Sequence, residues 1–105
     1  MKFITRKEEL VMLSILNLED KAYLIAIQEH LTQVMGKAES LTSVHLPLSR
    51  LEKSGLITSR FGDATAVRGG RRKKIYRLTE EGLEALQAYK RISDDLWDGL
   101  IQSVT

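Results

Sequence analysis

The sequence predicts a mainly α-helical domain of the α+β class, in which three helices precede a two-stranded β-hairpin and a long helix follows it. Two patterns carry this prediction. Apolar residues recur at helical spacing in four segments, and two short β-branched or aromatic segments lie between the third and the fourth. At 105 residues and 11.9 kDa, with 43% apolar and 29% charged residues, the chain has the size and balance of one globular domain.

The first helix is predicted from a start signal and an apolar run. Thr5 and Glu8 have the spacing of a capping box, in which each side chain satisfies a backbone N–H at the start of a helix. Glu19 and Asp20 end the run. We expect a largely buried helix, whose apolar residues are Leu10, Val11, Met12, Leu13, Ile15, Leu16 and Leu18.

A second helix is expected from about Lys21 to Gly36, because glycine is the usual residue at a helix C-terminus. Residues 37–42 have no apolar period and are expected to form a short loop. The apolar positions at helical spacing in the second helix are Leu24, Ile27, Leu31 and Val34.

The third helix is predicted from about Val44 to Ser54, with Thr42 or Ser43 as its cap and Gly55 at its end. Pro47 places its start near Val44 or later, because proline is tolerated only in a first turn. The residues expected to face the core are Val44, Leu48 and Leu51.

Residues 56–61 and 74–78 alternate roughly in polarity and predict the β-hairpin. Their long connection holds glycines and arginines and is expected to be a cationic arm. Thr79, followed by Glu80 and Glu81, predicts the cap and first turn of the last helix. About 24 residues of helix span some 36 Å, longer than so small a domain covers, so the outer half of its apolar stripe needs a partner.

Helix, helix, helix, hairpin, helix is the order of a winged helix-turn-helix fold, in which the third helix enters the major groove and the hairpin, or wing, reaches along the DNA backbone. The charges agree with that order. Residues 43–77 hold nine basic and two acidic residues, a net charge of +7 in a chain whose total is +2. The side chains expected to contact DNA are Thr42, Ser43, His45, Ser49, Arg50, Lys53, Arg68, Arg71, Arg72, Lys73 and Lys74.

Two stretches of the sequence resemble the PadR-like family of transcriptional regulators. Residues 44–57, VHLPLSRLEKSGLI, look like that family's recognition helix and the turn into its wing, and residues 69–82, GGRRKKIYRLTEEG, are similar to its basic wing strand and the start of its last helix. Residues 22–25, AYLI, resemble more weakly the element that opens its second helix. The resemblance covers most of the chain.

This resemblance implies a homodimeric repressor that binds a pseudo-palindromic double-stranded DNA operator and, as in some members, is released by a small aromatic effector near the dimer interface. Residues 1–78 would form the DNA-binding domain and residues 79–105 the dimerisation helix. Tyr89 and Trp97 are interpreted as interface core, the alternative being a stacking platform for the effector. The residues expected at the dimer interface are Leu86, Tyr89, Ile92, Leu96, Trp97, Leu100 and Ile101.

Other classes of function find little support in the sequence. There is no cysteine, and two isolated histidines, His30 and His45, do not make a metal site, so neither metal nor cofactor is expected. No catalytic motif accompanies the serine, histidine and acidic residues, so an enzyme is not expected. No apolar run reaches membrane-spanning length, and we expect a cytoplasmic protein. The remaining alternative is a winged helix that binds an acidic protein partner and has no operator.

Overall fold

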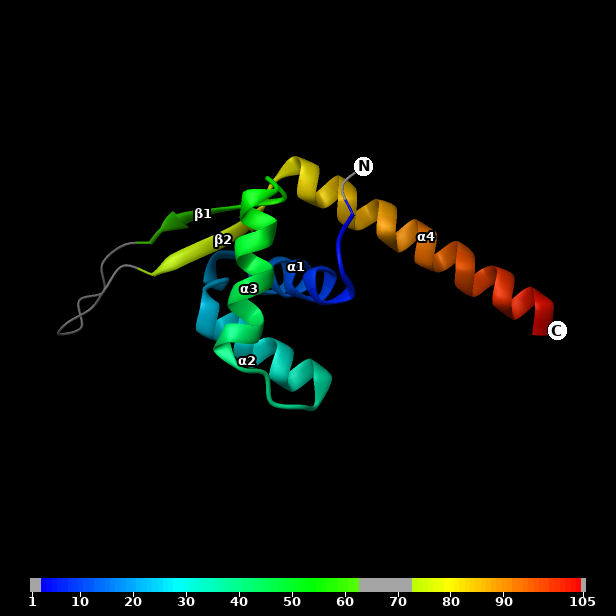
Figure 1. The fold of residues 1–105 in the computed structure, drawn as a ribbon, viewed down its shortest axis with the longest axis horizontal. Helices are drawn as coiled ribbons and strands as arrows, with labels where there is room; N and C mark the ends of the chain where they lie inside the picture. The colour runs from blue at the N-terminus through cyan, green and yellow to red at the C-terminus, as the bar shows by residue number, and fades with distance from the viewer. Residues whose placement is uncertain (1–2, 63–72, 105) are drawn as a thin grey trace.

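The computed structural model describes residues 3–62 and 73–104, with side chains up to Leu100, and it confirms the predicted winged-helix fold (Figure 1). Three helices form a small bundle, the hairpin leaves it on one side, and the last helix projects away on the other. The elements in chain order are α1 (Arg6–Leu18), the 3₁₀ turn η1 (Glu19–Lys21), α2 (Leu24–Met35), α3 (Leu41–Lys53), β1 (Ile57–Phe61), β2 (Lys74–Leu78) and α4 (Glu80–Val104).

The capping box predicted at the start of α1 is present. The Thr5 hydroxyl accepts a hydrogen bond from the Glu8 backbone N–H, and the Glu8 carboxylate accepts one from the Thr5 N–H. The prediction of a largely buried helix is wrong for Leu13 and Leu16, which are exposed. At 3.6 residues per turn, a helix with one face in the core turns these two positions away from it.

α2 begins later than predicted, at Leu24, because Glu19–Lys21 form the 3₁₀ turn and Tyr23 is extended and bridges to Ile75 of β2. It ends as predicted at Gly36, whose φ of +67° lies in the left-handed region that suits glycine. Val34, one of the apolar positions at helical spacing, is 63% exposed, because the last turn of α2 extends past α1 and α3.

α3 begins one turn earlier than predicted. Its cap is Ser40, whose hydroxyl accepts a hydrogen bond from the Ser43 N–H, so neither Thr42 nor Ser43 is the cap. The prediction that Pro47 marks the first turn is also wrong, because Pro47 lies inside the helix and is buried. Proline removes one backbone hydrogen bond there, and burial of its ring against the core opposes that cost.

The hairpin pairs β1 with β2 antiparallel, from Ile57 opposite Leu78 to Phe61 opposite Lys74. The core lies between the three-helix bundle and the inner face of this hairpin. It holds one continuous cluster of buried side chains, contributed mainly by Val11, Met12, Ile15, Ile27, Leu31, Val44, Leu48, Leu51, Leu56, Ile57, Tyr76, Ala85 and Leu86.

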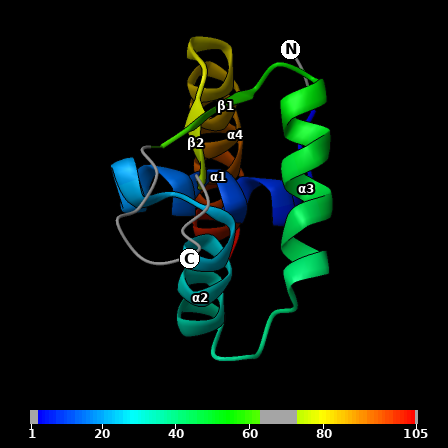
Figure 2. The same cartoon turned by 90° about the vertical axis from the view of Figure 1, so that its left-hand side faces the viewer.

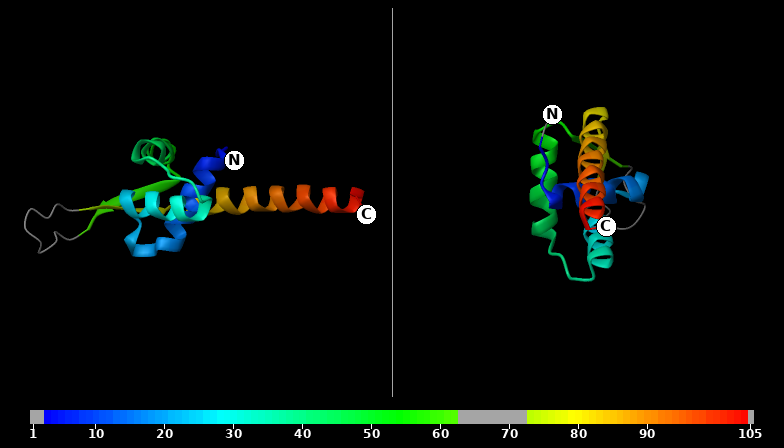
Figure 3. Two further views of the ribbon diagram at one scale, coloured as in Figure 1. Left: turned by 90° about the horizontal axis from the view of Figure 1, so that it is seen from below. Right: turned by 90° about the vertical axis from the view of Figure 1, so that its right-hand side faces the viewer.

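A tight joint fixes where α4 leaves the domain. The Thr79 N–H donates to the Leu56 carbonyl at 3.1 Å, and the Thr79 hydroxyl donates to the Gly55 carbonyl at 2.7 Å. Gly82 lies so close to this turn that a Cβ on it would be 1.9 Å from the Leu56 oxygen. Beyond the joint, α4 runs straight out of the domain (Figure 3). None of the helices in the described residues is long and apolar enough to span a membrane.

Candidate nucleic-acid interface

No other described element covers the outer face of α3, which lies at one edge of the molecule in Figure 2. With Val44, Leu48 and Leu51 buried, the helix turns Thr42, His45, Arg50 and Lys53 to the exposed side and leaves Ser49 half-buried at its edge. These side chains can donate hydrogen bonds to phosphates or to base edges in a groove.

Leu46 lies among these polar side chains and is 53% exposed, yet the sequence interpretation did not include it in the interface. The helical period of the buried residues would have predicted its exposure, because position 46 falls on the side of the helix opposite Val44 and Leu48. An exposed leucine on this face can contact the methyl group of thymine in the major groove.

Arg50 is paired with a residue that the sequence did not connect to it. Its Nε lies 3.5 Å from Oε2 of Glu8, near the start of α1, and its side chain is 57% exposed. Two acidic residues nearer in the sequence, Glu52 and Asp63, are the partners that position along the chain would suggest. Glu52 instead pairs with Lys74, and Asp63 lies outside the described residues.

Ser43 takes part in a polar cluster at the start of α3. Its hydroxyl donates to Oε2 of Glu39 at 3.0 Å, and Lys7 of α1 donates to the other oxygen of that carboxylate. These two hydrogen bonds hold the pKa of the largely buried Glu39 below its usual range. Ser43 thus anchors the start of α3 to α1, and Thr42 beside it remains exposed.

The base of the wing is attached to α3 by a second polar cluster. Glu52 accepts a hydrogen bond from the Ser59 hydroxyl at 2.6 Å and one from Lys74 Nζ at 3.1 Å. The hydrogen bond from Ser59, with a smaller contribution from Lys74, lowers the pKa of Glu52. The hydrogen bond to Glu52 in turn raises the pKa of Lys74. On the α2 side, the ammonium of Lys73 lies 4.1 Å from the centre of the Tyr23 ring, within cation–π range.

Lys73 and Lys74, both expected to contact DNA, therefore also fix the orientation of the hairpin relative to the bundle. The other three expected wing residues, Arg68, Arg71 and Arg72, lie outside the described residues.

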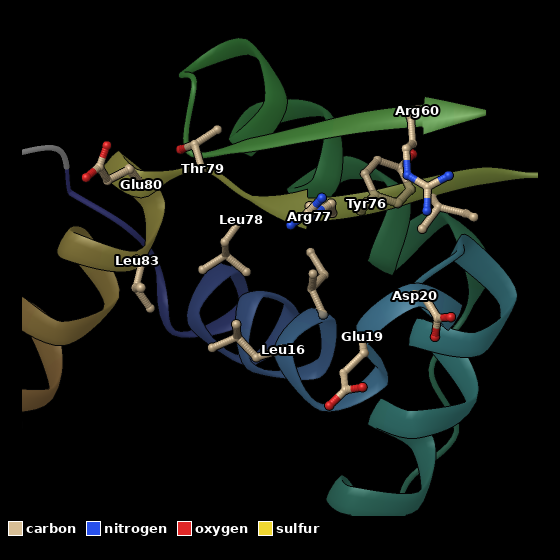
Figure 4. Close-up of a pocket in the computed structure, with 12 residues that line it drawn as sticks. Leu16, Glu19, Asp20, Arg60, Tyr76, Arg77, Leu78, Thr79, Glu80 and Leu83 are labelled. Carbon is tan, nitrogen blue, oxygen red and sulfur yellow. The ribbon is translucent and has the colours of Figure 1, made fainter. Parts of the chain in front are cut away.

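On the other face of the hairpin, a cleft of about 530 Å³ lies between α1, the strands and the start of α4 (Figure 4). Leu16 and Leu83 form part of its apolar wall, Glu19 is at its acidic edge, and Arg60 and Arg77 project from the strands. The sequence interpretation named neither arginine nor this cleft. Tyr89 and Trp97, which were interpreted as interface core with an effector platform as the alternative, do not line it.

α4 carries the apolar stripe that was predicted to need a partner, with one correction. Leu86 is buried in the core of its own protomer, so its side chain is not available to a second chain. Tyr89 is half-buried, and its hydroxyl accepts a hydrogen bond from the Ile4 N–H at 3.1 Å. The other large apolar side chains described on this outer part of α4 are all exposed: Ile92, Leu96, Trp97 and Leu100. The side chain of Ile101 lies outside the described residues.

Comparison with solved structures agrees with this architecture. A PadR family transcriptional regulator from Eggerthella lenta has 28% identity and a TM-score of 0.70, with 94% of this chain and 84% of that chain aligned. One from Clostridium difficile has 27% identity and a TM-score of 0.68, over 93% and 98% of the two chains. A PadR-like transcription factor from Bacteroides fragilis shares the fold at 22% identity, with a TM-score of 0.73 over 95% and 93%.

No curated protein matches the sequence significantly. The family profile described as the transcriptional regulator PadR-like family matches residues 12–88, which include α2, α3, the hairpin and the joint with α4. That match covers most of the chain and agrees with the free outer face of α3 and the cationic hairpin beside it. The chain belongs to the PadR-like family of transcriptional regulators and is a DNA-binding regulator of the winged-helix type.

Proposed function

We propose that this chain is a homodimeric repressor that binds a pseudo-palindromic operator in double-stranded DNA. The observation that carries the proposal is the uncovered outer face of α3, where hydrogen-bond donors surround one exposed leucine. In this proposal residues 1–78 bind DNA and residues 79–105 hold the two copies together. The two copies of α3 enter successive major grooves, and the wings lie on the flanking backbone.

The two surfaces make different kinds of contact in this proposal. On α3, Arg50 reads guanine through its guanidinium, Leu46 contacts a thymine methyl, and Lys53 lies against the backbone. His45, Ser49 and Thr42 supply further polar contacts on the same face. The wing residues Arg68, Arg71, Arg72, Lys73 and Lys74 contact phosphates, which gives affinity that depends on salt and little on sequence.

We propose a second copy of this chain as the partner of α4. Leu96 is 70% exposed and Trp97 62% exposed, on a helix segment that the rest of the described protomer does not cover. Exposed apolar patches of this kind mark association surfaces, because burying them against a like surface removes them from water. A two-fold arrangement of α4 also gives the symmetry that a palindromic operator requires.

A flat aromatic effector fits the same region. When two copies of α4 pair, Trp97 from each copy lies at or beside their interface, where an aromatic molecule can stack on the indole ring. Titration of the protein with planar aromatic compounds should then quench Trp97 fluorescence and release bound DNA. Quenching without release would assign Trp97 to an interface that does not control DNA binding.

The experiment that tests the proposal is a binding selection from a randomised double-stranded DNA pool at near-physiological salt, with the molecular mass measured in parallel. We expect enrichment of an inverted repeat with half-sites about one helical turn apart, and a dimeric mass. Salt-sensitive binding without enrichment would refute sequence-specific regulation, and the absence of binding would favour the protein-interaction alternative. Repression is then tested by in vitro transcription from a promoter that carries the enriched repeat. A repressor should reduce the amount of transcript when it is added.

A further inference from the structure

Glu8 is a buried carboxylate whose two oxygens have different partners. Its Oε1 accepts the Thr5 N–H at 2.7 Å in the capping box of α1, and its Oε2 lies 3.5 Å from Nε of Arg50. Glu8 is only 7% exposed, so its position is fixed by backbone and packing and does not vary as that of a surface side chain does. The capping box therefore holds one oxygen of a fixed carboxylate beside the last turn of α3.

The atom of Arg50 that Glu8 contacts determines what the rest of the guanidinium can do. Nε is the guanidinium nitrogen nearest the aliphatic part of the side chain, and it faces Glu8. No described residue accepts a hydrogen bond from the two terminal nitrogens of Arg50. When the Nε edge of a planar guanidinium faces a carboxylate, its terminal N–H groups remain available on the other edges, and these groups form the fork that donates to O6 and N7 of guanine.

We propose that Glu8 is a positioning residue for sequence reading: it holds Arg50 so that its terminal nitrogens point to a guanine in the operator. This inference rests on the proposed function. A guanidinium without such a partner can turn to any nearby phosphate, which adds affinity for every sequence. Pairing with Glu8 disfavours contact with phosphates, because the carboxylate neutralises the charge of the arginine and repels phosphate groups. Arg50 then contributes to binding mainly where a guanine accepts hydrogen bonds from its terminal nitrogens.

Glu8→Gln is the variant that isolates this role. Glutamine at this position also accepts the Thr5 N–H in a capping box, so the start of α1 is retained while the charge facing Arg50 is removed. Glu9→Gln is the matched control. It removes the same charge from the next residue of the same helix, where the carboxylate pairs with Arg6 at 2.8 Å and not with α3.

Binding of each variant should be measured on the duplex recovered by the selection above, on that duplex with the contacted guanine pair replaced, and on random DNA at the same salt. We expect Glu8→Gln to lose about tenfold in affinity for the recovered duplex and to bind random DNA as well as wild type or better. Glu9→Gln should preserve the wild-type preference. With the guanine pair replaced, Glu8→Gln should bind as well as wild type or better.

A second variant keeps the test valid should Glu8→Gln fold poorly. Arg50→Lys, at an exposed position, has no Nε and no fork, so it should lose the same preference, and Glu8→Gln added to it should cause no further loss. The inference is overturned if Glu8→Gln and Glu9→Gln discriminate equally well, if Glu8→Gln weakens all duplexes equally, or if it binds the recovered duplex more tightly. A wild-type protein without sequence preference would instead refute the proposed function, before any variant is made.

Discussion

Replacing Gly82 by alanine should destabilise the domain, although the same replacement stabilises an ordinary helix interior. Gly82 lies in the first turn of α4, and a Cβ on it would be 1.9 Å from the Leu56 carbonyl oxygen. Carbon and oxygen atoms that are not bonded approach to about 3.3 Å at closest. The first turn of α4 would therefore have to move by more than about 1 Å, because the Leu56 carbonyl belongs to the backbone and cannot rotate away as a side chain can.

The size of the effect follows from what this movement disturbs. Overpacking of this kind costs about 1–3 kcal/mol, and the hydrogen bonds that Thr79 makes to Leu56 and Gly55 are worth about 1 kcal/mol each. The higher helix propensity of alanine stabilises the folded state by about 1 kcal/mol in the opposite direction. Together these terms give a net loss of about 2–4 kcal/mol in the free energy of unfolding, which lowers the Tm of a domain of this size by roughly 10 °C or more.

Gly99→Ala is the matched control, because Gly99 lies in the same helix and a Cβ there meets nothing within 4 Å. It should leave the free energy of unfolding unchanged or raise it by up to about 1 kcal/mol. Urea unfolding followed by far-ultraviolet circular dichroism, at one protomer concentration, measures both variants. The proposed joint between α4 and the end of α3 is refuted if Gly82→Ala is as stable as wild type or more stable.

Three further predictions concern DNA, association and pH. Replacing Arg71 and Arg72 by alanine should weaken binding to all duplexes. Because the proposed dimer carries two copies of each arginine, the slope of log affinity against log salt should fall by about four, as measured by titration at several salt concentrations. Leu96→Asp combined with Leu100→Asp should give monomers in sedimentation, and a variant that still dimerises would refute the α4 interface. Glu52→Gln should lower stability at neutral pH, because the pKa of Glu52 is lowered in the folded protein. Its Tm should converge with that of wild type as the pH falls through that lowered pKa, and a constant difference down to about pH 3 would contradict this origin.

Local patterns in the sequence predicted most of the fold. The capping box of α1, the glycine at the end of α2 and the pairing of β1 with β2 depend on residues close in the chain or on simple periodicity, and the structure contains all three. Helix periodicity predicted poorly how wide each buried face is. Leu13 is exposed because α1 turns it away from the core, and Val34 because the last turn of α2 extends past α1 and α3. The local sequence does not specify where a neighbouring element ends.

Pro47 shows a different reason for error. A rule about backbone hydrogen bonds placed it in a first turn, but burial of its ring and the Ser40 cap stabilise a helix that starts earlier. The exposed side of α3 was predicted, since the phase of its buried residues fixes which side chains face outward. The ion pair of Glu8 with Arg50 could not be predicted, because the partners are far apart in the chain and meet only after α1 packs on α3.

The joint at Gly82 has a consequence for the length of the operator. Because Gly82 contacts Leu56, just after α3, the direction of α4 is fixed relative to α3. In the proposed dimer, the contact between the copies lies farther along α4, so the stretch from Gly82 to Ile92 sets the separation and rotation of the two copies of α3. One inserted residue in this stretch would turn the contacting stripe by about 100° and shift it by about 1.5 Å. Relatives with a longer or shorter stretch should therefore select operators with a different half-site spacing.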